Sequence, residues 1–129
     1  MADQLEGLWR LAGSSAWDEA DNKLPTPYGA LPMGTMTFAG GRMLAALCNG
    51  DAGITDRGFS SYGGPYTFDG KTLVTTVDIA LDASRLGGQQ IRGVVMQGAD
   101  RMLMSPPPRL YGGKRERREI IWERVWRPA

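Results

Sequence analysis

The chain has 129 residues, of which 42% are hydrophobic and 22% charged, and its 15 lysines and arginines nearly balance 14 aspartates and glutamates. This length fits a single domain covering residues 1–129, and the composition excludes a wholly disordered chain. The net charge of +1 lacks the excess of positive charge that nucleic-acid-binding proteins usually carry, so no nucleic-acid partner is expected.

Short segments with the composition of β-strands fill most of the chain. Residues 5–7 are expected to form a short turn of helix before the first strand, and residues 18–32 are expected to form a long loop. Beyond them, apolar or β-branched stretches alternate with turn signals, for which 18 glycines and 8 prolines provide the residues. The predicted strands cover residues 8–17, 33–38, 42–49, 61–68, 72–81, 89–97, 101–105 and 117–126.

Most of these strands are joined by short turns, so neighbours in sequence should pair antiparallel. Asp69-Gly70 is the strongest hairpin signal of the chain. Closing such a meander into a barrel removes the exposed edges of the sheet. The sequence therefore predicts an all-β fold: an eight-stranded antiparallel up-and-down barrel with a short N-terminal helical turn.

Several motifs, taken in order, resemble the bacterial lipocalin-like domain family of the calycin group. They are Gly7-Leu8-Trp9-Arg10-Leu11, Gly34-Thr35-Met36-Thr37-Phe38, Gly41-Arg42-Met43, the segment from Tyr62 to Gly70, Arg92, Leu103 with Ser105-Pro106-Pro107, and Trp122-Glu123-Arg124-Val125. The family usually has a histidine where this chain reads Val74-Thr75-Thr76-Val77. The resemblance implies a calycin-type barrel but no particular ligand.

The resemblance also implies a structural floor to the barrel. In lipocalin-type barrels the tryptophan of the opening motif closes one end, and an arginine from the last strand stacks on it. Trp9 and Arg124 occupy these positions. A planar guanidinium can cover an indole ring while its N–H groups bind nearby carbonyls. A ligand contact is the alternative role for Trp9.

Candidate catalytic groups are Asp78, Arg92 and Tyr66. If the hairpin of residues 72–97 is centred on Arg85, Asp78 and Arg92 lie opposite each other. Facing the lumen, they could anchor a ligand, or Asp78 could act as a general base; facing outward, they would form a weak ion pair. A one-residue change of register exchanges the two faces, so both alternatives stay open.

Candidate ligand contacts are side chains expected to reach a hollow interior. Methionine adapts to irregular apolar ligands but also serves as core filler, and a tyrosine hydroxyl can bind a carbonyl group. The residues proposed as ligand contacts are Met36, Met43, Tyr62, Thr75, Met96, Met102 and Met104.

The residue types that the sequence lacks exclude several kinds of metal site and catalytic site. Histidine is absent and Cys48 is the only cysteine, which excludes a multi-cysteine zinc site and histidine-assisted nucleophiles, so no metal and no cofactor are expected. Residues 1–6 lack the pattern of a signal peptide, and the longest apolar run, residues 43–48, is too short for a membrane span. We therefore expect a cytoplasmic protein without a membrane partner.

Three functional hypotheses follow from a barrel of this size, whose interior can hold one small ligand. The first is an intracellular lipocalin-like protein that binds a small, mostly apolar molecule. The second is a cofactor-independent isomerase, cyclase or lyase acting on a hydrophobic natural-product or aromatic substrate. The third is a barrel that forms a homodimer through exposed strands or through its Trp-rich last strand.

Overall fold

The regular secondary structure of the described residues is almost entirely β-strand. The computed structural model describes residues 4–26, 28–51, 53, 55–107, 109–111 and 114–129. Within them the barrel wall is built from β1 (Gly7–Asp18), β3 (Pro32–Ala39), β4 (Arg42–Asn49), β5 (Ser60–Phe68), β6 (Thr72–Thr76), β8 (Gln89–Met96), β9 (Arg101–Ser105) and β11 (Lys114–Trp126). Three short strands are added to this wall: β2 (Lys23–Leu24), β7 (Ile79–Ala80) and β10 (Arg109–Tyr111).

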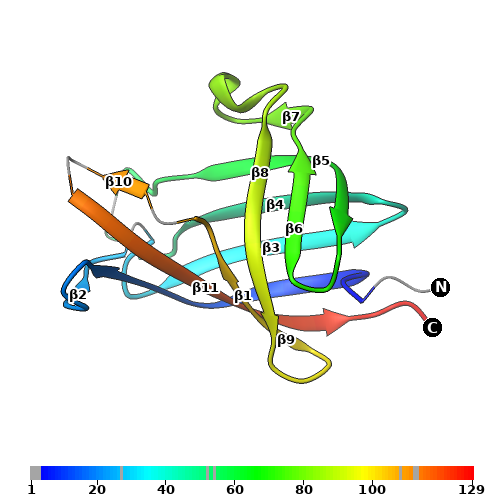
Figure 1. Cartoon of the computed structure of the whole chain (residues 1–129), viewed down its shortest axis with the longest axis horizontal. Coiled ribbons are helices and arrows are strands. Elements are labelled where there is room, and N and C mark those ends of the chain that lie inside the picture. The colour runs from blue at the N-terminus through cyan, green and yellow to red at the C-terminus, as the bar shows by residue number, and fades with distance from the viewer. Residues whose placement is uncertain (1–3, 27, 52, 54, 108, 112–113) are drawn as a thin grey trace.

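The wall closes because its first and last strands pair with each other. Each neighbouring pair is antiparallel, and the order of pairing is β1–β3–β4–β5–β6–β8–β9–β11, after which β11 returns to β1. The closing ladder runs from Leu8 opposite Trp126 to Asp18 opposite Glu116, and Figure 1 shows the strands curving around a common interior. The described residues therefore form a closed, eight-stranded antiparallel β-barrel with almost no helix, as the sequence predicted.

Alternation of side chains decides which residues enter the barrel. On β1, Trp9 and Leu11 are buried while Leu8 and Arg10 are exposed, as expected for a strand with one face toward a core. Aromatic and thioether side chains fill much of the interior. The largest fully buried side chains are those of Trp9, Trp122, Phe38, Leu5, Met36, Leu73 and Met102.

The predicted strand at residues 72–81 is interrupted at Val77 and Asp78. β6 and β7, on the two sides of this break, pair with β5 in registers that differ by one residue. Gly64 of β5 allows the close approach there, because its φ is +153° and a Cβ atom would lie 2.0 Å from the carbonyl oxygen of Thr76. β8 pairs with β6, whereas β7 pairs with β5.

Short elements account for the other differences from prediction. The helical turn expected at residues 5–7 is wrong, because Gly7 already belongs to β1. Helix in the described residues is limited to the 3-10 turn η1 (Ala83–Arg85), which lies beside β7 at one end of the barrel (Figure 1). β2 and β10 lie in segments for which no strand was predicted. No helix among the described residues has the length and apolar character needed to cross a membrane.

Candidate ligand-binding site

A cavity of about 570 Å³ opens at the end of the barrel that carries η1. This end is where β5 and β8 begin and where β9 ends. The volume falls within the range of small-molecule sites in proteins. The lining residues are Ser14, Tyr28, Ser60, Asp82, Ser84, Arg85, Gln89, Gln90, Ile91, Arg92, Pro106, Pro107, Arg118 and Ile120.

Strand alternation points the central lining side chains inward. On β8, Gln90 and Arg92 are partly buried, whereas Ile91 between them is exposed. On β11, Ile120 lies two residues from the buried Trp122 and therefore on the same inward face. Polar and apolar walls consequently meet in one cavity.

Arg85 is positioned by the 3-10 turn in which it lies. Asp82 caps this turn by accepting a hydrogen bond from the Ser84 backbone N–H at 3.0 Å. The guanidinium of Arg85 then lies over the ring of Tyr62, 4.3 Å from its centre, and donates to Ser60 Oγ at 3.0 Å. Burial is the largest influence on the pKa of Arg85 and lowers it from the ordinary value.

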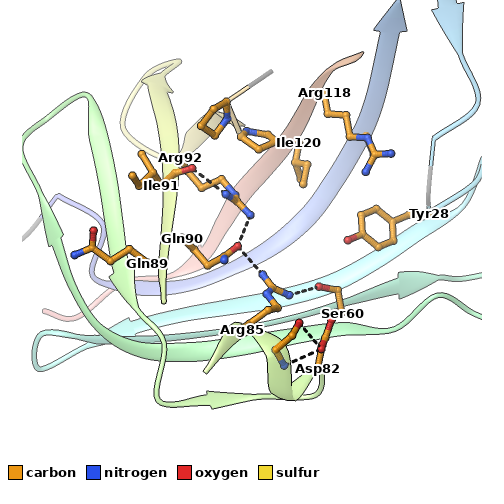
Figure 2. A pocket seen from close by; sticks show the side chains of 14 residues that line it. Tyr28, Ser60, Asp82, Arg85, Gln89, Gln90, Ile91, Arg92, Arg118 and Ile120 are labelled. Atoms are coloured by element: carbon orange, nitrogen blue, oxygen red, sulfur yellow. Dashed lines mark hydrogen bonds between the residues drawn. The ribbon is translucent and has the colours of Figure 1, made fainter. Parts of the chain in front are cut away.

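Gln90 joins this arginine to a second one. Its side-chain Oε1 accepts a hydrogen bond from Nη2 of Arg85 and another from Nη2 of Arg92, each at 2.9 Å. Arg92 also donates from Nη1 to the carbonyl oxygen of Ile91 at 2.8 Å. Figure 2 shows the two guanidiniums converging on Gln90 inside the cavity.

The opposite wall carries Tyr28, Arg118 and Ile120 (Figure 2). Arg118 has its own acidic partner, since its Nη2 lies 3.3 Å from a carboxylate oxygen of Glu116. Ile120 packs against the core of the barrel. This wall therefore offers a phenol, a compensated cation and an apolar side chain.

The structure brings Trp9 and Arg124 together at the other end of the barrel. The Arg124 guanidinium lies 4.4 Å from the centre of the Trp9 ring, and its two Nη atoms donate to the carbonyl oxygens of Glu6, Gln4 and Ala99 at 2.6–2.8 Å. The Trp9 indole N–H donates to the carbonyl oxygen of Leu5 at 2.8 Å. The N-terminal segment is thereby tied to the last strand.

The predicted pairing of Asp78 with Arg92 is wrong. Arg92 lies opposite Leu73. Asp78 instead accepts a hydrogen bond from Arg42 at 2.8 Å, with both side chains about half exposed. This hydrogen bond is the main cause that lowers the pKa of Asp78. Asp78 is therefore an ionised surface group outside the cavity, and Arg92 alone of this pair lines it.

Most of the expected ligand contacts are packed into the core. Seven residues proposed as catalytic or ligand-binding are at most 9% exposed: Met36, Met43, Tyr62, Tyr66, Thr75, Met102 and Met104. None of the seven lines the cavity at the η1 end. Met96 lies at a separate cavity of about 350 Å³ beside Arg124 and Arg127. Tyr66 packs edge-on against Phe38, with ring centres 5.0 Å apart.

Two of these buried residues still lie next to the cavity lining. Tyr62 contacts Arg85, as described above. Thr75 is the cross-strand neighbour of Gln90, and its buried hydroxyl has no hydrogen-bond partner among the described residues. Tyr62 therefore packs directly against a lining residue, and Thr75 lies beside another on the neighbouring strand.

Arg85 and Gln90 were not among the candidate site residues proposed from the sequence, where Arg85 served only as the centre of a hairpin. The alternation Gln90-x-Arg92 signals two long polar side chains on one strand face, but it does not say which face is inside. Arg85 follows a capping pattern, Asp82-x-Ser84, that marks a turn without indicating the direction of its next side chain.

Comparisons with known proteins identify no family. No protein-family model matches the chain, and no curated protein matches it. Among solved structures, the chain is similar to a redesigned β-barrel, with a TM-score of 0.49, 11% sequence identity, and coverage of 94% of this chain and 91% of that one.

Proposed function

We propose that this protein binds a small organic molecule in the cavity at the η1 end of its barrel. The observation that carries the proposal is the cavity of about 570 Å³, whose walls come from β1, β5, β8, β11 and η1. A site formed by several parts of a closed barrel is held in place by the hydrogen bonds of the wall. Its shape is therefore preformed, which lowers the entropic cost of binding.

The lining favours an amphipathic ligand over the mostly apolar one expected from the sequence. Arg85, Gln90 and Arg92 make one side polar, whereas Ile120 and the prolines after β9 provide apolar surface. Four of the five methionines proposed as ligand contacts, Met36, Met43, Met102 and Met104, are instead buried in the core. A ligand with one polar end and an apolar body matches both walls.

We also propose that the barrel is of the lipocalin-like, up-and-down type. Two observations support this assignment. Pairing follows chain order around the whole wall, apart from the added short strands. At the floor, Arg124 stacks on Trp9 as the resemblance implies. Both features agree with a barrel that is closed at one end and receives its ligand at the other.

Binding is better supported than acid–base catalysis. A carboxyl group in the cavity would need a raised pKa to act as a general acid at neutral pH. Asp82, the carboxylate among the described lining residues, has its pKa lowered, first by a side-chain hydrogen bond from Ser84. It is therefore ionised at neutral pH and engaged in capping η1.

The proposal is tested with dansylglycinamide, a neutral fluorescent molecule whose emission rises in a low-polarity site. We expect saturable binding to the wild-type protein. Ser14 and Ser15 are adjacent on β1, and Ser14 lines the cavity while Ser15 does not. Ser14→Trp should abolish the fluorescence increase by filling the cavity, and Ser15→Trp, the matched control, should preserve it. Equal binding by both variants, or none by the wild type, would refute the proposed site.

A further inference from the structure

We propose that the ligand carries a carboxylate group and that Arg85 and Arg92 together bind it. This inference rests on the proposed function, because it assigns the chemical class of the molecule in the same cavity. It concerns the polar wall alone and leaves the apolar body of the ligand unspecified.

The first argument is the closeness of two positive charges. Nη2 of Arg85 and Nη2 of Arg92 each lie 2.9 Å from the same oxygen of Gln90, so the two nitrogens are at most twice that distance apart. Two guanidiniums this close repel each other, and the repulsion is strengthened where burial excludes water. An anion between them removes this repulsion.

The second argument is that the hydrogen-bond partners of both guanidiniums are neutral, although the Asp82 carboxylate of the same lining interacts electrostatically with Arg85. Their hydrogen-bond acceptors are Ser60 Oγ, Gln90 Oε1 and the carbonyl oxygen of Ile91. Within the described residues, neither arginine has a carboxylate oxygen within 4.0 Å. Arg57 and Arg115 share this property but line neither cavity. A carboxylate does lie within that distance of Arg10, Arg42, Arg101, Arg117, Arg118, Arg124 and Arg127.

The third argument is the number of N–H groups left for a ligand. Each guanidinium has five donors, and the hydrogen bonds above use two from Arg85 and two from Arg92. The remaining donors suit the planar, two-oxygen geometry of a carboxylate, which binds arginine through paired hydrogen bonds. Because Gln90 holds both groups in place, little side-chain entropy is lost when the anion binds.

The experiment compares dansylglycine with dansylglycinamide, which differ by a carboxylate against a neutral amide of the same shape. We expect the carboxylate to bind the wild type at least about tenfold more tightly, as charge-assisted hydrogen bonds replace neutral ones. Arg92→Gln should weaken dansylglycine binding by about 10- to 100-fold and leave dansylglycinamide affinity nearly unchanged. Arg85→Gln should act in the same direction.

The matched control is Arg10→Gln, which removes one positive charge from the outer face of β1, where Arg10 pairs with Glu123. It should leave the affinity for dansylglycine unchanged. The carboxylate assignment is overturned if both probes bind equally, or if Arg10→Gln weakens dansylglycine as much as Arg92→Gln does. In those cases Ser14-dependent binding of dansylglycinamide would still support the cavity. If neither probe binds, both proposals fail.

Discussion

Replacing Arg124 with methionine should destabilise the barrel by removing the polar connection between its floor and its N-terminal segment. The substitution deletes three hydrogen bonds to backbone carbonyls, at 2.6–2.8 Å, an ion pair with Asp100 at 3.0 Å, and the stacking of a cation on Trp9. Methionine keeps an apolar side chain against the indole ring, so the cavity left behind is small.

The magnitude follows from these contacts. Two of the three hydrogen bonds to carbonyl oxygens are exposed, so water compensates part of their loss. Each of the three therefore contributes about 1 kcal/mol to the unfolding free energy. Loss of the cation–π contact adds about 0.5–1 kcal/mol. With about 0.5 kcal/mol for the ion pair with the half-exposed Asp100, the expected loss is about 4 kcal/mol of unfolding free energy. This lowers Tm by about 15 °C in a domain of this size.

Urea and thermal denaturation followed by far-UV circular dichroism measure this loss. The matched control is Arg101→Met, which breaks an ion pair with Glu123 whose side chains are 45% and 38% exposed, and which should cost about 0.5 kcal/mol. If Arg124→Met and Arg101→Met destabilise the protein equally, the floor does not depend on Arg124 and the reasoning is refuted.

Three further changes test other parts of the fold. Gly64→Ala should lower stability by about 2–4 kcal/mol in urea denaturation, because a Cβ atom would lie 2.0 Å from the carbonyl oxygen of Thr76; a loss below 1 kcal/mol would contradict this close approach. Thr75→Val should raise Tm, by the equivalent of about 1 kcal/mol, because it replaces a buried hydroxyl that has no partner with a methyl group of similar size; a lower Tm would show that the hydroxyl is satisfied. The pKa values of Asp69 and Asp82 are lowered from 3.8 by hydrogen bonds from their own turns. These hydrogen bonds therefore stabilise the folded protein fully above pH 3.8, and the stabilisation is lost as the pH falls through the lowered pKa values. The stabilisation from these two turns should therefore be constant between about pH 5 and 8. In thermal unfolding, the double variant Asp69→Asn, Asp82→Asn should show a smaller fall of Tm at acid pH than the wild type.

The strands were predictable from the sequence because each has a clear local pattern. The ranges 42–49 and 101–105 coincide with β4 and β9. Alternating burial on β1 and the hairpin signal at Asp69-Gly70 also correspond to the structure. Such patterns are local properties of the chain, and closure follows from the need to cover the two outer edges.

The register across residues 72–97 was not predictable in the same way. Symmetric counting placed Asp78 opposite Arg92, whereas the bulge at Val77–Asp78 removes two residues from the predicted strand, and β6 alone pairs with β8. The bulge coincides with the close approach of Gly64 to Thr76, and those residues come from different strands. A contact between two strands cannot be recognised from the pattern of residues along either strand alone.

The candidate site was predictable only in part. Arg92 was identified and lines the cavity, but its partners Gln90 and Arg85 depend on the register and on the direction of a turn. The inward methionines were expected to border a hollow. Whether inward side chains leave space or fill it depends on how they pack together from several strands, which sequence alternation does not specify.

The location of the ligand is the most direct test of a binding barrel open at the η1 end. Amide chemical shifts of the ¹⁵N-labelled protein, followed during titration with dansylglycine, should change at Gln90, Arg92 and Ile120, which line the larger cavity. Gly98 and Ala99, at the smaller cavity beside Arg124, should stay unchanged. Shifts confined to Gly98 and Ala99, or spread over the outer surface of the wall, would contradict the account.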